Sequence, residues 1–504
     1  MTTWFITRHP GALEWAAQQG LQIDRHVVHL DPTEIQPGDT VIGSLPVHLA
    51  AEVCQRGARY FNLSLDLPAS ARGRELSADA LQAFNARLEA YNVQREALLT
   101  EATRIPDSEK CLHIVLATGE NLPNLIPALA PSLKAGEVII IASRAMQGNA
   151  EKLRYGLQQS GLPESHCRII SDCPDHNLPL ILAWANQQAR QIMAEAAGKR
   201  CILNLTGGNK LMTIGFLQAF RPHAEIIYCD TEAGRIDYFH PIGRAQEKLP
   251  VNLLTLKPYL AAQGFKLRDH TPDLSGITHR AELTRQLAYE APRIERLIGQ
   301  LNGATYHFRE GKLDRAGVEA SGNSAEQKLL DLLVDRKMLK KTGRHLMIAD
   351  DTAATYLGGG WLEEWCWLVG KELEQGEPGK RLSASRWGIN LMIDPWNHLP
   401  IPGRNQYPLN ELDAVFIHRN RMLLIECKSG QQISDRGESQ GILNKLETLG
   451  KHVGGRLDTK WLLTARSIDR NTQARQRAEN YRIKIIRPDE LVDLKAAILR
   501  WMTQ

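Results

Sequence analysis

Residues 410–429 read NELDAVFIHRNRMLLIECKS, in which two apolar runs flank a short basic turn. Apolar runs of this length joined by a turn predict a β-hairpin, which would bring Asp413, Glu426 and Lys428 together at one end of a sheet. Because side chains alternate along a strand, we expect Glu426 and Lys428 on one face and Cys427 on the other. The hairpin therefore predicts a cluster of charged side chains at a strand end.

Two carboxylates and a lysine are groups that suit hydrolysis of a phosphodiester. Carboxylate oxygens hold a hard divalent cation, Mg²⁺ or Mn²⁺, while a lysine orients or helps deprotonate the attacking water and neutralises developing charge. A surface hairpin with ordinary solvated charges is the alternative. It is disfavoured because burying Glu426 beside the apolar run 422–425 is costly unless a metal or a partner compensates. We therefore predict a metal-dependent nuclease centre whose catalytic residues include Asp413, Glu426 and Lys428.

The spacing Asp-x12-Glu-x-Lys resembles that of the PD-(D/E)XK nuclease superfamily. Leu412 stands where a proline usually precedes the aspartate, a position that is often relaxed in the superfamily. The resemblance implies a restriction-endonuclease-like domain, which we place at residues 325–504, with Mg²⁺ or Mn²⁺ as its cofactor. It also implies metal ligands at Asp413, Glu426 and Cys427.

A second part of this resemblance lies at residues 358–365, which read GGGWLEEW. Glycines followed by apolar residues at helical spacing predict a loop that enters an amphipathic helix. Superfamily members commonly supply one more acidic ligand from such a helix, so the resemblance assigns Glu363 as a catalytic and metal-binding residue. Lys445, on the helix that we expect after the hairpin, could face nucleic-acid phosphate. For both side chains the alternative is ordinary solvation on a helix surface.

Length and composition indicate several domains, since the chain has 504 residues of which 43% are hydrophobic. No apolar run is long enough for a transmembrane span, and no signal peptide is visible, so we expect a cytoplasmic protein without membrane contact. Eight cysteines are scattered without a C-x-x-C pair, which argues against a zinc site. The small net charge of +4 is uneven, because the basic excess lies after residue 320. This distribution agrees with a polyanionic substrate.

Residues 109–250 alternate strand-like and helix-like segments, which predicts a doubly wound, mainly parallel α/β sheet. Ligands of such sheets sit beyond the C-terminal strand ends, where the strand order reverses. The loops 117–121 and 205–210 fall there, and the second offers glycines, a helix N-terminus and a lysine to a phosphate. A tight strand-to-helix connection without a ligand is the alternative. The candidate ligand-binding residues are Thr118, Gly119, Asn121, Thr206, Gly207, Gly208, Asn209, Lys210 and Asp230.

The segments LNLTGGNKLM (203–212) and IYCDTE (227–232) resemble the CRISPR-associated Rossmann-fold sensor domain, CARF. Members of that family bind cyclic oligoadenylate as dimers with the ring on the two-fold axis, so the resemblance implies an isologous homodimer. A CARF domain followed by a PD-(D/E)XK domain resembles the CRISPR ancillary nucleases that cyclic tetra-adenylate activates. The resemblance covers roughly residues 109–500. It implies ring-activated cleavage of DNA, RNA or both in type III CRISPR antiviral defence.

Residues 251–324 carry the weakest pattern of the chain. We expect a strand and a short helix within 251–265, one helix over 280–302 and a polar linker at 316–324. We interpret the whole stretch as a connector that transmits ring binding to the nuclease.

Residues 1–105 predict a second small Rossmann-like unit, closed by a helix over 81–100. Arg8, His9, Ser44 and Asp66 follow predicted strand ends, where they could bind a phosphodiester and promote attack by a ribose 2′-hydroxyl without a metal. Solvation of His9 near a helix start is the alternative.

The segment WFITRHPGA (4–12) and similar short motifs resemble a small CRISPR-associated family that has been proposed to include ring nucleases. The resemblance implies that this unit linearises cyclic oligoadenylate, with Arg8, His9, Ser44 and Asp66 as its catalytic residues. One polypeptide would then sense the ring, cut nucleic acid and reset. Two rivals stay open: a CARF regulator with an inactive nuclease fold that only grips nucleic acid, and a nuclease whose N-terminal unit is a second sensor.

Overall fold

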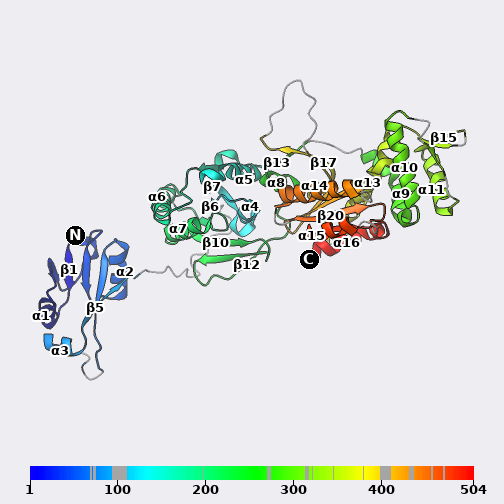
Figure 1. Ribbon diagram of the computed structural model, residues 1–504. Coiled ribbons are helices and arrows are strands. Elements are labelled where there is room, and N and C mark those ends of the chain that lie inside the picture. Colours follow the sequence, from blue (N-terminus) through cyan, green and yellow to red (C-terminus); the bar gives the residue numbers. More distant parts are fainter. Residues whose placement is uncertain are drawn as a thin grey trace. The chain divides into compact units, whose positions relative to one another are not determined.

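The computed structural model describes residues 1–68, 71, 75–93, 111–196, 198–268, 274–312, 317–319, 322–343, 345–377, 380–397, 410–430, 436–455, 458–468 and 472–503. The chain divides into two compact units, Met1–Arg104 and Ile105–Gln504 (Figure 1). The domain limits that we predict near residues 105–109 lie outside the described residues. Within the described part, no helix has the length and hydropathy that a membrane crossing needs.

The N-terminal unit is a sheet with helices on both faces, and its strand order is β2-β1-β3-β4-β5. The strands run parallel except β5, which pairs antiparallel with β4. Helices α1 and α3 pack around Phe5 and Trp15 on one face, and α2 packs around Trp4 and Val53 on the other. The elements are β1 (Thr3–Ile6), α1 (Pro10–Gln18), β2 (Arg25–Val27), β3 (Thr40–Gly43), α2 (Val47–Gln55), β4 (Arg59–Ser64), α3 (Ala78–Ala83) and β5 (Arg87–Tyr91).

The helix that we predict over residues 81–100 is wrong in the described part of that range. Helix α3 ends at Ala83, Asn85 takes a positive φ of 53°, and β5 follows. The charged residues of β5 suggested a helix, but its pairing with β4, a long-range contact, decided the structure.

The second sheet has the order β12-β11-β10-β9-β6-β7-β8 and is parallel from β10 to β8, as the α/β pattern predicts. Its central strands are continuous apolar runs because helices cover both faces. Helices α6 and α7 pack on one face, and α4, α5 and α8 pack on the other. The strands are β6 (Cys111–Leu116), β7 (Ala135–Ile141), β8 (Cys167–Ile170), β9 (Cys201–Asn204), β10 (Glu225–Asp230), β11 (Arg235–His240) and β12 (Glu247–Lys248). The helices are α4 (Leu122–Leu129), α5 (Gln147–Gln159), α6 (Leu178–Ala196), α7 (Lys210–Phe220) and α8 (Leu256–Ala262).

The third sheet has the order β13-β17-β18-β19-β20-β21 and contains the hairpin. Arg419 and Asn420 turn the hairpin with φ values of 50° and 59°, the geometry of a two-residue type I′ turn. Helix α13 covers one face of the sheet and α14 covers the other (Figure 1). The elements are β13 (Phe265–Leu267), α13 (Trp361–Glu374), β17 (Trp387–Pro395), β18 (Asn410–His418), β19 (Arg421–Lys428), α14 (Arg436–Gly454), β20 (Asp458–Thr464), α15 (Thr472–Asn480), β21 (Ile483–Ile486) and α16 (Leu494–Thr503).

Residues 251–324 do not form a separate connector, because α8 packs on the second sheet and the elements from β13 onward pack with the third. Strand β13 pairs antiparallel with β17. The single helix expected over 280–302 is wrong, because Pro292 lies in a short break between α9 and α10. Both helices join the apolar core around α13. The domain limits at residues 251, 324 and 325 remain predictions. The remaining elements are α9 (Leu274–Glu290), α10 (Glu295–Arg309), β14 (Gly317–Val318), α11 (Ser324–Asp335), β15 (Leu339–Thr342), β16 (His345–Ile348) and α12 (Asp351–Thr355).

Candidate active site and ligand-binding loops

The charged cluster forms where β18 and β19 diverge. The two strands pair from His418 with Arg421 as far as Ala414 with Ile425. One residue beyond this ladder, Asp413 Oδ2 accepts a hydrogen bond of 2.7 Å from the backbone N–H of Cys427. The aspartate side chain thus holds the strand end in place of a backbone carbonyl.

Glu426 and Lys428 lie on one face of β19, as the alternation predicts, and their side chains are in contact. Lys428 Nζ lies 2.7 Å from Glu426 Oε1 and 3.4 Å from Asp413 Oδ2. Lys445 of α14 reaches the same glutamate oxygen at 3.3 Å. Glu426 is only 1% exposed, so two ammonium groups converge on a fully buried carboxylate.

Helix α13 brings Glu363 to this cluster. A single π-turn, Tyr356–Gly360, precedes the helix, and Gly359 in it has a φ of 145° that side-chain-bearing residues rarely adopt. Burial, with further contributions from the charges of Asp413 and Glu411, raises the pKa of Glu363 to about 7. Glu363 therefore lies close enough to Asp413 for the two carboxylates to compete for negative charge.

The neighbouring Glu364 points to another part of the molecule. Arg280 of α9 donates to its carboxylate, with Nε 3.1 Å from Oε1, and the guanidinium also lies over the Tyr356 ring. Of the two adjacent glutamates, Glu363 faces the charged cluster and Glu364 ties α13 to α9.

Asn390 is a polar residue of this site that sequence reasoning missed. It lies on β17 opposite Asp413, between the paired residues Ile389 and Leu391, and its φ is 52°. Its side chain is hydrogen-bonded to the Glu363 carboxylate. Asparagine tolerates this left-handed conformation better than most residues, but the local sequence pattern does not predict the conformation.

A clasp formed by Asn302, Ser429 and Gly358 fixes the end of β19. Asn302 of α10 donates from Nδ2 to the Ser429 carbonyl at 2.8 Å. The Ser429 hydroxyl lies 3.0 Å from Asn302 Oδ1 and 3.1 Å from the Gly358 carbonyl oxygen. Because Ser429 follows Lys428 and Gly358 precedes Glu363, the clasp ties the two halves of the cluster together.

The donor set fits a hard divalent cation. Asp413 and Glu363 both have raised pKa values, chiefly because they are buried, and the charge of Glu426 adds to the effect on Asp413. Burial thus favours the neutral form of both carboxyl groups in the absence of a bound cation. Among the described residues, no three His, Cys, Asp or Glu side chains converge into a ready metal cage. The carboxylates are present, but ammonium groups hold their oxygens.

The Cys427 side chain is placed away from these oxygens. Its thiol lies 3.9 Å from Cys366 Sγ in the core under α13, and the hydrogen bond with Cys366, together with burial, raises its pKa. Its backbone carbonyl, in contrast, lies on the Lys428 side, where it accepts a hydrogen bond of 2.9 Å from Nζ. Any ligation by Cys427 would therefore use the carbonyl oxygen.

Lys428 is placed to act as a cation. Burial by itself lowers the pKa of its ammonium group, but Asp413 and Glu426 together raise that pKa above its ordinary value. The lysine consequently stays protonated at neutral pH, which favours orientation and charge neutralisation over proton abstraction.

The two predicted ligand loops meet at the C-terminal ends of two central strands of the second sheet. Strands β6 and β9 are neighbours, and the chain order reverses between them. A Cβ on Gly207 would lie 1.9 Å from the Leu116 carbonyl oxygen, so glycine there permits close packing of the loops. Gly208 has a φ of 74°, a conformation that glycine adopts at no cost.

The predicted ligand residues differ in accessibility. Gly119, Asn209 and Lys210 are exposed, whereas Asn121 is buried. Asn209 caps α7 by accepting from the Met212 N–H. Thr206 Oγ1 accepts from the Cys229 N–H of β10, Asp230 closes a turn to Ala233, and Thr118 is half-buried.

Asn121 links its loop to α8. Its Nδ2 donates to the Ala262 carbonyl at 2.9 Å. Tyr259, also on α8, donates from its buried hydroxyl to the Gly454 carbonyl at the end of α14, at 2.8 Å. The loop after β6 thus connects through α8 to the helix that carries Lys445.

In the N-terminal unit, the four predicted residues do not contact one another through any hydrogen bond or ion pair of the described residues. His9 pairs with Glu75 at 3.0 Å, and Ser44 Oγ donates to the Leu63 carbonyl. Arg8 is exposed. Asp66 belongs to a separate network.

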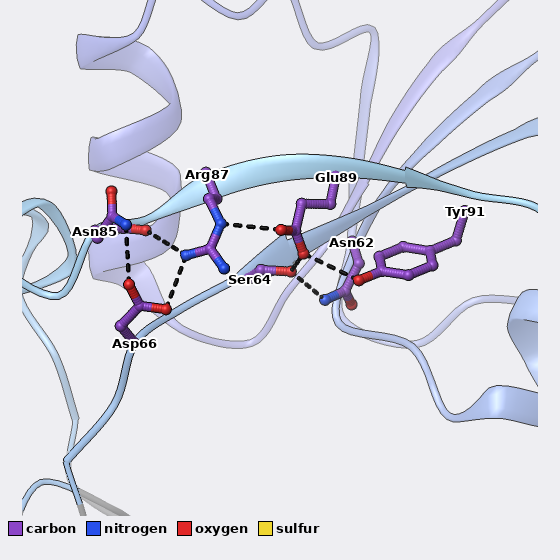
Figure 2. A network of polar contacts seen from close by, with 7 residues as sticks. All are labelled: Asn62, Ser64, Asp66, Asn85, Arg87, Glu89 and Tyr91. Carbon is purple, nitrogen blue, oxygen red and sulfur yellow. Dashed lines mark hydrogen bonds and ion pairs between the residues drawn. The ribbon is translucent and has the colours of Figure 1, made fainter.

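That network runs along β4 and β5 (Figure 2). Arg87 lies between two carboxylates, 2.9 Å from Asp66 Oδ1 and 2.9 Å from Glu89 Oε1. Ser64 Oγ lies 2.5 Å from Glu89 Oε2, and Tyr91 donates to the same oxygen at 3.0 Å. The side chains of Ser64, Arg87, Glu89 and Tyr91 stand on one face because they alternate along paired strands, and Asp66 follows the end of β4.

Three segments match protein-family models. Residues 4–94 match "Putative CRISPR-associated protein (Cas_VVA1548)", residues 113–259 match "Card1 CARF domain", and residues 350–504 match "Card1-like, endonuclease domain". The chain carries a CARF domain and a Card1-like endonuclease domain. The matches confirm the three resemblances found in the sequence, and the endonuclease match supports a nuclease activity.

Two solved structures share the fold of the CARF and endonuclease domains. Protein VC1899 from Vibrio cholerae is 22% identical, with a TM-score of 0.63, over 78% of this chain and 98% of that one. Can2 from Sulfobacillus thermosulfidooxidans, solved with cyclic tetra-adenylate, is 21% identical, with a TM-score of 0.59, over 78% of this chain and 99% of that one. A search of curated protein sequences gives no match.

Proposed function

We propose that this chain is a nuclease of type III CRISPR antiviral defence that cyclic oligoadenylate activates and that a divalent metal ion assists. The observation that carries the proposal is the buried cluster of Asp413, Glu426 and Lys428 in a domain that follows a CARF domain. The CARF domain would bind the ring, and the endonuclease domain would cut DNA, RNA or both. Cyclic tetra-adenylate is our choice of ring because the similar Can2 binds it.

In the endonuclease domain, Asp413, Glu426, Glu363 and the carbonyl oxygen of Cys427 would hold Mg²⁺ or Mn²⁺. The ion would supply positive charge that polarises the scissile phosphodiester. Lys428 stays protonated, so it would orient the attacking water and neutralise charge that develops on the phosphate. Lys445 would move from Glu426 to a phosphate oxygen of the bound strand.

Activation requires that the ring bind two arrangements of the chain with different affinity. The contacts from Asn121 to Ala262 and from Tyr259 to Gly454 support a route between the ring loops and α14. Lys210 is exposed beside the N-terminus of α7, where its charge would attract a phosphate of the ring.

A homodimer fits a ring with two-fold symmetry. Exposed apolar side chains on the CARF domain support this assembly, since Leu211 and Ile214 lie on the outer side of α7 and are 39% and 49% exposed. Tyr228 and Phe239 form an exposed edge-to-face pair on the neighbouring strands. Sedimentation of the purified chain, with Ile214→Lys as the interface variant, tests the dimer.

The N-terminal unit would degrade the ring and so limit the response. Arg8, His9, Ser44 and Asp66 remain our candidates, although His9, Ser44 and Asp66 make contacts with other residues. The assay uses the full chain with Asp413→Asn and measures linear oligoadenylate formed from the ring. Loss of product in the additional His9→Ala variant supports this assignment, whereas undiminished turnover rejects His9. Ring binding by the unit without turnover favours a second sensor.

The main test combines purified protein, Mn²⁺, plasmid or single-stranded RNA, and cyclic tetra-adenylate. We expect cleavage that needs both the ring and the metal ion and that Asp413→Ala and Lys428→Ala abolish. Specific nucleic-acid retention without cleavage, at any ring size, would favour the regulator with an inactive nuclease fold.

A further inference from the structure

A groove of about 310 Å³ opens beside the charged cluster, between α14 and the edge of the third sheet. Lys445 lines this groove and also reaches Glu426 Oε1 at 3.3 Å, so the groove adjoins the nuclease centre. The lining residues are Phe265, Asn410, Asn444, Lys445, Thr448, Leu449 and His452.

The lining has the chemistry of a nucleotide site. Phe265 and Leu449 supply apolar surface, and an aromatic ring is a face on which any base can stack. Asn410, Asn444 and Thr448 supply neutral hydrogen-bonding groups. Lys445 and His452 are the ionisable lining residues, and the lining of the groove that the structure describes contains no carboxylate. An anionic ligand with a flat polar base therefore suits this groove better than a cation or a lipid chain does.

Helix geometry and packing hold the lining residues of the groove in place. Asn444, Thr448 and His452 are spaced four residues apart, which places them in one row along α14. Tyr481 donates from its hydroxyl to Asn444 Oδ1 at 3.0 Å, which leaves the Asn444 Nδ2 as a donor. Phe265 is half-buried against the apolar core, so its ring has little freedom.

We propose that this groove binds the nucleotide of the substrate strand that adjoins the scissile phosphodiester. The base stacks on Phe265, Asn410 and Asn444 hydrogen-bond its edge, and Lys445 holds the phosphate next to the carboxylates. The inference rests on the proposed nuclease function and assigns a substrate subsite to it.

A second groove, between α14 and α15, provides a control. It has a volume of about 420 Å³ and a polar lining, but its described lining residues include no aromatic ring and no lysine. The lining residues are Ser439, Gln440, Gln473, Ala474, Gln476, Arg477 and Asn480. Asn444→Asp on α14 and Asn480→Asp on α15 thus add the same charge, at the same size, to two different grooves.

The experiment measures ring-activated cleavage of a labelled oligonucleotide, with KM and kcat separated. For Asn444→Asp we expect a KM about tenfold higher, because the added charge repels the strand, and a nearly unchanged kcat. Phe265→Leu keeps an apolar side chain in the core and removes the stacking face, so it should raise KM similarly. Asn480→Asp should behave as the parent.

A binding measurement in EDTA, where no cleavage occurs, gives the second readout. The dissociation constant of the oligonucleotide should rise about tenfold for Asn444→Asp and stay at the parental value for Asn480→Asp. Equal binding and cleavage by all variants overturns the subsite, and so does equal weakening by Asn444→Asp and Asn480→Asp. A parent protein that neither cleaves nor binds polynucleotide overturns the proposed function itself.

Discussion

The nuclease centre and the network on β4 and β5 use the same kinds of side chain in opposite surroundings. In the centre, Asp413 is 8% exposed, and burial, followed by the charge of Glu426, raises its pKa. In the network, Asp66 has a side chain that is 59% exposed, and hydrogen bonds from Asn85 and then Arg87 lower its pKa (Figure 2). Burial favours the neutral form of Asp413, whereas hydrogen bonds to Asp66 favour its charged form.

The largest difference between the two regions should appear in nucleic-acid cleavage. Asp413→Asn removes a carboxylate at constant size, and we expect ring-activated cleavage to fall by about 10²–10³-fold. The matched change in the network, Glu89→Gln, should leave cleavage unaltered. A gel assay with titrated enzyme measures both, and parental cleavage by Asp413→Asn would overturn the nuclease centre.

The pH dependence of stability sharpens the comparison. The pKa of Glu363 is about 7 in the folded protein against 4.5 for an ordinary glutamate, so the folded state binds the proton more tightly than the unfolded state does. The free energy of unfolding of the metal-free protein should therefore fall as pH rises from about 4.5 to about 7, by up to about 3 kcal/mol. Glu363→Gln should remove this loss in urea unfolding at pH 5 and pH 8. If the free energy of unfolding changes with pH equally in the parent and in Glu363→Gln, Glu363 is not the source of the pH dependence.

The same carboxyl should make metal binding depend on pH. A divalent cation binds the deprotonated form, so Mn²⁺ affinity should drop about tenfold between pH 8 and pH 6. Calorimetry in two buffers of different ionisation enthalpy would detect the released proton. In Glu363→Gln the proton release should disappear, and Glu89→Gln serves as the unaffected control. Affinity that is constant over this pH range would exclude Glu363 as a ligand.

Breaking the clasp should have a smaller effect on cleavage. Ser429→Ala removes the hydroxyl contacts with Asn302 and Gly358 but leaves the carbonyl bond from Asn302. We expect kcat to fall about threefold to tenfold with KM nearly constant, because Lys428 and Glu363 lose alignment while substrate contacts remain. Ser383→Ala, an exposed serine, is the control. A change in KM alone would place Ser429 in substrate binding instead.

The smallest effect is expected in the exposed network. Asp66 has a lowered pKa in the folded protein, so its contribution to stability is present above its ordinary pKa and is lost as pH falls through the folded value. Asp66→Asn should therefore reduce the unfolding temperature slightly at pH 7 and not at all near pH 2. Solvent screening keeps the difference small. A large loss at neutral pH would mean that the network has a structural role that its exposure does not suggest.

The regions differ also in how far the sequence predicted them. The hairpin follows from two apolar runs, and alternation alone places Glu426 and Lys428 on one face. Strand β5 was not predicted, because its residues acquire their structure from pairing with β4. The contacts of Asn390 with Glu363, and of Arg280 with Glu364, join residues far apart in the chain. Local patterns contain no information about such partners.

The candidate sites show the same limit. Thr206, Gly207 and Gly208 were predicted as ligand residues, and the structure gives the two glycines a packing reason as well, since Leu116 leaves no room for a side chain at 207. Asn121 stays a predicted ligand residue, and in the structure its amide donates a hydrogen bond to the Ala262 carbonyl of α8. Sequence motifs single out candidate loops, but they do not show which atoms of those loops already have hydrogen-bond partners.

Strand β13 limits how these modules can be exchanged between proteins. It lies before helices α9 to α11 in the chain, yet it is the edge strand beside β17. A chimaera joined at residue 325 would supply the endonuclease sheet with a foreign edge or none, leaving the backbone groups of β17 open to unintended association. A crossover point would therefore have to lie between α8, which packs on α5 of the second sheet, and β13, so that the segment from Phe265 onward is inherited together with the endonuclease.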